Sequence, residues 1–391
     1  MKFITFGCWN KGSCSMDTVE DPISAVMQHV KNEISKNEYD FMILSGDNYY
    51  PEKINKNKIF NEDNLKSGFD CLIKIPIKKY IINGNHEYGD IYKSSNFPNS
   101  VDPKEFLYCQ NIKYQLEYSR LPNFNFFKNV MVMYEDKTLV IMIDTTIYDE
   151  LKDEELSCYD GIFGMKINLE YIKKDNNKNK IINKIKEKQL EQVIDIFNSP
   201  TIIEKEIQNL IFVGHHPIIN CRNKKSKDVF NVLDDLKNFF NNVFDYLTYK
   251  AKNIKIAKIV YLCADTHFYQ KGIVSIKNVY GNTYPIEQHI VGTGGATCDT
   301  ICPNSREYSN LLGDIDYIIL DQKQEYGYLK YDSSDNGTFL FQSVPFNLAY
   351  YTVINGIIKL SENIKSSDDK KLCQNEGSRK YEIEYKLKEK S

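Results

Sequence analysis

Short, largely apolar runs recur along the chain and give its first structural signal. Their unbroken apolarity predicts strands that are buried on both faces, as in layered α/β proteins. The six clearest runs are Phe3–Phe6, Phe41–Leu44, Ile77–Ile82, Leu139–Ile143, Leu210–Val213 and Ile259–Leu262. The sequence therefore predicts an α/β fold with buried strands.

Helices are predicted between these runs. A helical period of 3.6 residues places five apolar side chains of the segment after Asp21-Pro22 on one face. They are Ile23, Val26, Met27, Val30 and Ile34. Asp21 and Pro22 supply an expected N-terminal cap and first-turn proline. Two further helices are expected, from about Asn183 to Phe197 and from about Val229 to Leu247.

The last third of the chain has a different pattern. Residues 288–292, 326–331 and 339–344 alternate or lie beside glycine-rich turns, which predicts strands. Asp335-Asn336-Gly337 between the last two predicts a hairpin turn. We expect one domain over residues 1–350 and a Lys/Glu-rich, partly disordered tail over 351–391, with one strand at Tyr381–Tyr385.

Composition narrows the class of protein. The chain has 391 residues and a formal net charge of −3, which argues against a dedicated nucleic-acid binder. It has no run of about 18 apolar residues, so no membrane span is expected. The N-terminus is too short for a signal-peptide core, which predicts a cytoplasmic or intracellular protein whose ten cysteines are reduced. Cys298 and Cys302 have only a weak zinc-like spacing.

Four polar motifs follow predicted strands directly. They are Gly46-Asp47-Asn48-Tyr49-Tyr50, Gly84-Asn85-His86-Glu87, Gly214-His215-His216-Pro217 and Ala264-Asp265-Thr266-His267. Ligands of α/β sheets collect at the carboxyl ends of strands. Each motif alone is compatible with an ordinary turn or a structural histidine, whereas their shared placement favours a common site.

The residue types in these motifs suit transition metals. Asp47 can bridge two cations, and Tyr50 can offer a phenolate to Fe(III). Asn85 offers an amide oxygen, while His215 and His267 offer imidazole nitrogens. Mixed nitrogen and oxygen ligation suits Fe, Zn or Mn. Two such ions a few ångströms apart can activate water and stabilise both oxygens of a phosphoryl transfer.

These motifs, in this order, resemble the calcineurin-like metallophosphoesterases, and most of all their purple acid phosphatase branch. That branch carries GD-x-x-Y, matched by Gly46–Tyr50, and GNH[DE], matched by Gly84–Glu87. Lesser similarities are Ile143-Asp144-Thr145, Gln189-Leu190-Glu191, Val291–Gly295 and Tyr326–Leu329. The resemblance covers about residues 1–345. It implies a four-layer α/β/β/α sandwich of two mixed β-sheets with the metals at their carboxyl edge.

Two positions depart from the family pattern. Cys8 stands where the family's first aspartate is expected, and Asp265 stands where the first histidine of Gly-His-x-His is expected. The resemblance assigns Asp47, Tyr50 and His267 to one metal, with Cys8 as a candidate ligand. It assigns Asp47, Asn85 and His215 to the other, with Asp265 as a candidate. Both substitutes can coordinate metal, and each can also be an ordinary structural residue.

The resemblance also implies catalytic roles for two histidines. It makes His86 the residue that helps the leaving group depart, and it places His216 in the same cleft, near the phosphate. The first hypothesis is therefore a metal-dependent phosphoesterase that acts on a phosphorylated substrate. The alternative is a catalytically impaired pseudophosphatase that acts as a scaffold or binding module, with a protein partner. A nuclease is disfavoured because no basic and aromatic residues interleave near the motifs.

Overall fold

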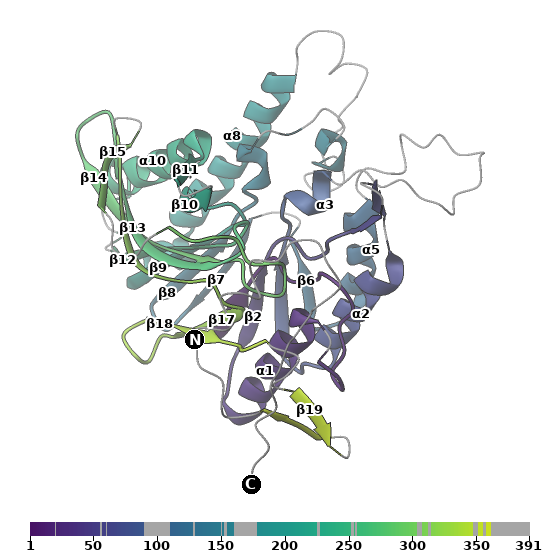
Figure 1. The fold of residues 1–391 in the computed structure, drawn as a ribbon. Coiled ribbons are helices and arrows are strands. Elements are labelled where there is room, and N and C mark those ends of the chain that lie inside the picture. The colour runs from purple at the N-terminus through teal and green to yellow at the C-terminus, as the bar shows by residue number, and fades with distance from the viewer. Residues whose placement is uncertain are drawn as a thin grey trace.

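Two β-sheets with helices on their outer faces make up the fold (Figure 1). The computed structural model describes residues 1–19, 21–54, 57–59, 61–89, 110–127, 130–149, 151, 155–159, 178–224, 227–251, 254, 256–302, 307–311, 314–346, 351–354 and 357–360. The two sheets are both mixed, and the predicted α/β sandwich is confirmed.

The first sheet has six strands, of which four successive neighbours, β1, β2, β5 and β6, are parallel. Its order is β18 (Thr338–Ser343), β17 (Gly327–Asp332), β1 (Lys2–Phe6), β2 (Phe41–Ser45), β5 (Lys78–Ile82) and β6 (Phe124–Phe126). The turn between β17 and β18 has Asn336 and Gly337 at φ 51° and 66°. This is the predicted hairpin.

The second sheet has eight strands, and its neighbours β8, β9, β12 and β14 are parallel. Its order is β15 (Glu307–Leu311), β16 (Ile315–Lys323), β13 (Tyr269–Lys277), β14 (Thr283–Val291), β12 (Ile256–Cys263), β9 (Ile207–Val213), β8 (Thr138–Met142) and β7 (Met131–Glu135). Small two-stranded sheets pair β3 (Glu52–Ile54) with β4 (Asn57–Ile59), β10 (Ile219–Lys224) with β11 (Lys227–Val232), and β19 (Tyr351–Ile354) with β20 (Ile357–Leu360).

Helices cover both outer faces (Figure 1). Those beside the six-stranded sheet are α1 (Pro22–Lys36), α2 (Glu62–Ile73) and α5 (Gln110–Glu117); those beside the eight-stranded sheet are α8 (Lys178–Asn198) and α10 (Asp234–Tyr249). Shorter turns are α3 (Asn85–Gly89), α9 (Pro200–Ile203), η1 (Tyr118–Arg120), η2 (Thr146–Tyr148) and η3 (Glu155–Ser157). No helix in the described ranges combines the length and apolarity needed to cross a membrane.

The core divides at the eight-stranded sheet because side chains alternate along a strand. On β8, Val140 and Met142 face the first sheet, while Leu139 and Ile141 pack with residues of α8 and α10. The six predicted strands correspond to β1, β2, β5, β8, β9 and β12. Strands β2 and β8 are buried along their whole length, while β1, β5, β9 and β12 are buried except at some positions, most of them near their starts.

Two expectations need correction, and a third lies where the structure gives no description. The helix expected from Val229 begins instead at Asp234, because Val229 and Val232 pair with β10 in a hairpin. Asp21 occupies the N-cap position of α1, but its carboxylate accepts from the Ser13 amide rather than capping the helix. The proposed tail over 361–391, with its strand at Tyr381–Tyr385, lies outside the described residues.

The cysteines are also not all reduced. Disulfides join Cys14 to Cys71 and Cys221 to Cys302. Cys298 and Cys302 therefore do not form a zinc-binding pair, because the Cys302 sulfur is already bonded to Cys221. Cys8 is a free, buried thiol.

Candidate metal centre

The predicted site residues gather at the carboxyl ends of two parallel strand sets. Strands β1, β2 and β5 lead into Cys8, Asp47 and Asn85, while β9 and β12 lead into His215 and Asp265. The two edges meet where the Nδ1 of His215 lies 2.7 Å from the carbonyl oxygen of Ser45. Glycine permits this approach, since a Cβ on Gly46 would lie 2.4 Å from that same nitrogen.

Three of the site residues have an unusual backbone. Cys8, Asp47 and Asp265, each two residues beyond a strand, have φ of 53°, 51° and 59°. This left-handed conformation costs about 1–2 kcal/mol for a residue with a Cβ. Such strain persists where the surroundings enforce it, and it concentrates at functional sites. Cys8 and Asp265 thus share the backbone geometry of the central aspartate.

Asp47 lies at the centre and divides the site into two halves. Its Oδ1 is 3.2 Å from the Nε2 of His215 and accepts from the His86 amide at 3.1 Å. The same His215 Nε2 lies 3.1 Å from the side-chain oxygen of Asn85. We call Asn85, His215 and Asp265, with this Asp47 oxygen, the Asn85 half.

The other carboxylate oxygen serves a second group. Asp47 Oδ2 is 2.7 Å from the Tyr50 hydroxyl and 3.9 Å from the Cys8 sulfur. The Tyr50 hydroxyl also lies 3.0 Å from the Nε2 of His267. We call Cys8, Tyr50 and His267, with this Asp47 oxygen, the Tyr50 half.

Backbone carbonyls fix which nitrogen each histidine presents. His215 Nδ1 faces the Ser45 carbonyl, and His267 Nδ1 lies 2.9 Å from the Thr297 carbonyl. A carbonyl can only accept, so both Nδ1 atoms carry the proton of the neutral ring. Both Nε2 atoms then turn lone pairs inward, which is how ligating histidines are oriented in metal sites.

This arrangement leaves more lone pairs than protons. In the Asn85 half, neutral His215 places its Nε2 lone pair against two oxygens that can only accept. In the Tyr50 half, Asp47 and His267 both face one hydroxyl, which has one proton to donate. Converging lone pairs without donors are what a bound cation requires, so the residues present fit two metal ions.

The titration behaviour of the metal-free site agrees with this geometry. Burial lowers the pKa of His215, but the Asp47 carboxylate raises it more, to about 9. Burial raises the pKa of Asp47, whereas the His215 and His86 charges more than offset this and lower it below its usual range. Without metal, a proton on His215 therefore compensates the carboxylate. Burial and the Asp47 charge raise the pKa of the Cys8 thiol and the Tyr50 phenol.

Metal-ligand groupings include both substituted residues. Ligand atoms of Cys8, Asp47 and His215 lie within 4.8 Å of one another, and so do those of His215, His216 and Asp265. All seven predicted ligands therefore lie at one edge of the sandwich, in two adjoining groups.

The two predicted catalytic histidines contact different parts of this centre. His86 is partly exposed, and its ring packs on Tyr50 with centroids 4.4 Å apart. His216 is buried, and its Nε2 has no hydrogen-bond partner among the described residues. That nitrogen lies 3.6 Å from an Asp149 carboxylate oxygen. His86 is thus partly open to solvent, whereas His216 is enclosed by the fold.

Sequence reasoning gave no role to the side chains that hold the loops together. The buried Glu87 carboxylate accepts from the backbone amides of Asp47, Asn48 and Gly84 and from the Gln115 amide. Burial and the Asp47 charge raise its pKa to about 7. Its position in the Gly-Asn-His-Glu motif was the available signal.

Thr145 and Asp299 support the histidines in a similar way. The Thr145 hydroxyl accepts from the amides of His215 and His216, each at 2.8 Å. Asp299 accepts from the His267 amide at 3.0 Å. Thr145 belongs to a motif noted above, whereas no sequence pattern marks Asp299.

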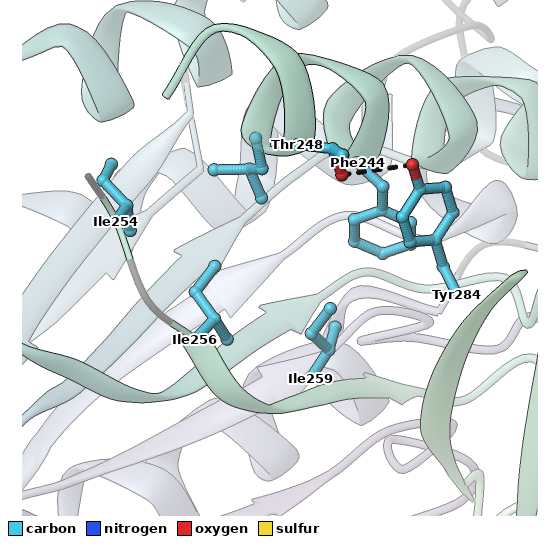
Figure 2. Close-up of a pocket in the computed structure, with 7 residues that line it drawn as sticks. Phe244, Thr248, Ile254, Ile256, Ile259 and Tyr284 are labelled. Atoms are coloured by element: carbon cyan, nitrogen blue, oxygen red, sulfur yellow. Dashed lines mark hydrogen bonds between the residues drawn. The ribbon is translucent and has the colours of Figure 1, made fainter. Parts of the chain in front are cut away.

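A separate hollow lies away from this chemistry. It has a volume of about 360 Å³ and is lined mainly by apolar residues of α10, β12 and β14 (Figure 2). Its polar feature is the contact between the Thr248 and Tyr284 hydroxyls, 3.1 Å apart. None of the predicted site residues lines it, so it has no part in the metal centre.

Comparison with known proteins places the site in a family. The family model described as calcineurin-like phosphoesterase matches residues 1–241. The structure titled GAP50, the anchor in the inner membrane complex of Plasmodium, covers 96% of this chain and 95% of its own at 14% identity and a TM-score of 0.49. A structure of PhoD covers 95% and 75% at 12% identity, with a TM-score of 0.43. No curated protein sequence matches significantly.

Proposed function

The chain belongs to the calcineurin-like phosphoesterase family, and we propose that it is a metal-dependent phosphoesterase with a dinuclear centre. One observation carries the proposal. The two oxygens of Asp47 face two different sets of ligand atoms, and with neutral histidines both sets have lone pairs without matching donors. A carboxylate shared in this way is suited to bridging two cations.

The ligands divide between the two halves. We assign Asn85, His215 and Asp265 to one ion and Cys8, Tyr50 and His267 to the other, with Asp47 shared. Bound ions would supply Lewis acidity toward the phosphate oxygens and activate a water molecule for attack. Asp47, Cys8 and Asp265 contribute negative charge, which retains the ions and balances their charge.

His86 has the geometry of a proton donor to the leaving group. Its ring is partly exposed, and its Nε2 lies 3.9 Å from Asp47 Oδ2. The Tyr50 ring supports one side of the imidazole. An imidazole held beside Asp47 can bind a phosphate oxygen and donate its proton as the ester bond breaks. His216 is buried beside His215, and its ligand atom lies within 4.8 Å of those of His215 and Asp265.

The finer assignment is to a purple acid phosphatase-like enzyme. Tyr50 is its support, because the hydroxyl points at Asp47 Oδ2 and His267 Nε2 rather than into the apolar core. A phenolate bound to Fe(III) gives a violet absorption band, so the iron-loaded protein is expected to be violet. Loss of that band in Tyr50→Phe, with iron still bound, would identify the tyrosine as the ligand.

The activity itself is tested with the purified chain loaded with Zn(II), Mn(II) or Fe. We expect phosphate release from p-nitrophenyl phosphate that is abolished by chelation and restored by added metal. Asp47→Asn is the matched variant, because it keeps the side-chain volume and removes the charge. Hydrolysis that is equal in the wild type and this variant would overturn the proposal.

One observation favours a second function, that of a pseudophosphatase scaffold. The Cys8 side chain packs in a small apolar cluster with Tyr50, Ala264 and Ala296, as a structural cysteine would. If Cys8 does not bind metal, two candidate anionic ligands remain in the Tyr50 half, the Asp47 carboxylate and a Tyr50 phenolate. A folded protein that retains one ion or none, and releases no phosphate from any ester, would favour the scaffold.

The disulfides Cys14–Cys71 and Cys221–Cys302 bear on where the chain folds. Disulfides persist in oxidising compartments and are rare in the cytosol. We therefore propose an oxidising compartment in place of the cytoplasmic one expected from the sequence. Recovery of the native chain from cells with both disulfides reduced would contradict this.

A further inference from the structure

We propose that the Cys221–Cys302 disulfide positions His267 for metal binding, a role that rests on the proposed metal centre. The disulfide joins β10 to the segment that follows β14, across 81 residues of sequence. Both cysteines are buried. The pair therefore lies inside the fold, next to the segment that touches a predicted ligand.

Residues 297–299 hold His267 through three hydrogen bonds. The Thr297 carbonyl accepts from Nδ1 of the ring at 2.9 Å, and the Asp299 carboxylate accepts from the His267 amide at 3.0 Å. The Asp299 amide donates in turn to the His267 carbonyl at 2.9 Å. Ring orientation and tautomer both depend on where this segment lies.

The next three residues attach that segment to β10. The Asn223 amide donates to the Thr300 carbonyl at 3.0 Å, and Arg222 forms a β-bridge with Ile301. The disulfide between Cys221 and Cys302 follows in register. Arg222 also extends a guanidinium nitrogen to within 3.5 Å of Asp299. The covalent bond therefore closes a short ladder whose other end contacts His267.

Strand β10 in turn follows His215 of the Asn85 half closely along the chain. It begins four residues after His215, and a buried glutamine on β13 holds its backbone. Gln270 accepts from the Cys221 amide at 3.4 Å and donates to the Cys221 carbonyl at 3.3 Å. Gln322 donates to the Cys302 carbonyl. The disulfide thus ties the segment that carries one histidine ligand to the strand that follows the other.

The second disulfide provides the matched control. Cys14–Cys71 joins the loop after β1 to α2, in the helical layer of the six-stranded sheet. The double variant C14A/C71A removes the same kind of bond from another region. A general loss of stability should appear in both double variants, whereas a positioning effect should appear in one.

Hydrogen exchange and metal affinity test the proposal in C221A/C302A and C14A/C71A. In C221A/C302A we expect faster amide exchange at residues 297–302 and an affinity for Co(II) at one of two sites that is about 10–100-fold weaker. C14A/C71A should match the wild type in both. Unchanged exchange in C221A/C302A, or equal changes in the two variants, would overturn the proposal.

Asp299→Ala keeps the Cys221–Cys302 disulfide and removes the acceptor for the His267 amide. It therefore tests whether residues 297–299 position His267, even if C221A/C302A fails to fold. We expect the same single-site loss of Co(II) affinity, and wild-type affinity would count against the proposal. Exchange at 297–302 does not require metal. If the wild type binds no Co(II), the proposed function fails, and the exchange comparison still decides whether the disulfide orders the segment that contacts His267.

Discussion

The two halves of the metal centre share Asp47 but differ in the kind of ligand they offer. The Asn85 half offers an amide oxygen, an imidazole and the Asp265 carboxylate. The Tyr50 half offers an imidazole, a phenol and the Cys8 sulfur, 3.9 Å from the shared carboxylate. Soft thiolate ligands favour metals such as Zn, whereas oxygen-rich sites accept Mn. The Cys8 sulfur thus makes the Tyr50 half softer than the oxygen-rich Asn85 half.

Each half is also supported by different parts of the fold. His215 is held by the Ser45 carbonyl and the Thr145 hydroxyl, both at strand ends. His267 is held by residues 297–299, which a disulfide ties to β10. The Asn85 half is therefore a product of sheet geometry, and the Tyr50 half depends in addition on a cross-linked segment.

Asp47→Asn should have the largest effect, because it weakens both halves together. We expect loss of both ions and a fall in turnover on the order of 10⁴-fold, since each ion contributes several kcal/mol of transition-state stabilisation. Metal analysis and phosphate release on the same sample measure this. Loss of one ion alone would show that Asp47 does not bridge the two halves.

His86→Ala should separate catalysis from metal binding. The His86 ring is partly exposed and packs on Tyr50. Its loss removes the proposed proton donor, so turnover should fall about 100–1,000-fold. Both ions should remain, because no ligand is removed. If metal content falls together with turnover, His86 helps to hold a metal ion rather than donating a proton to the leaving group.

Substitution of Cys8 should affect one half only. In Cys8→Ser we expect the Tyr50 half to lose metal affinity by at least about tenfold, while the Asn85 half keeps its ion. Cys8→Asp should retain both ions. The intact Co(II)-loaded protein should also show a thiolate charge-transfer band that Cys8→Ser lacks. Equal metal content and equal spectra in all three proteins would exclude Cys8 as a ligand.

Glu287→Gln should leave both halves unchanged and alter only stability. Burial alone would raise the pKa of Glu287, but its bonds to His289 and nearby lysines lower it to about 2, against 4.5 ordinarily. A lowered carboxyl pKa stabilises the fold above pH 4.5, and this stabilisation is lost as the pH falls toward 2. The variant should therefore be about 1–3 kcal/mol less stable than the wild type at pH 7 and similar to it near pH 2. Denaturant unfolding at both values measures the difference, and an equal deficit at both would contradict the assignment.

The sequence predicts the frame of the site better than its supports. Buried strands and the residues at their carboxyl ends follow from apolar runs and adjacent motifs, which is why Asp47, Asn85 and His215 are found in place. The contacts of Thr297 and Asp299 with His267 join residues about 30 positions apart and leave no local pattern. The Cys221–Cys302 pairing is equally invisible, because spacing does not determine disulfide connectivity.

Errors in secondary structure had the same origin. Val229 and Val232 continue the helical pattern of the segment after them, yet they pair with Arg222 and Ile219 in a hairpin. A partner strand determines their conformation, and that partner was not recognised from the sequence. The left-handed backbone at Cys8, Asp47 and Asp265 likewise has no single sequence signal, although a small residue precedes each of the three.

Metal content is the most direct test of a dinuclear centre built from these two halves. The measurement is inductively coupled plasma mass spectrometry on the purified wild-type chain after mild dialysis. Two transition-metal equivalents per chain are predicted, with one retained in Cys8→Ser. One equivalent or none in the wild type would contradict the proposed phosphoesterase centre.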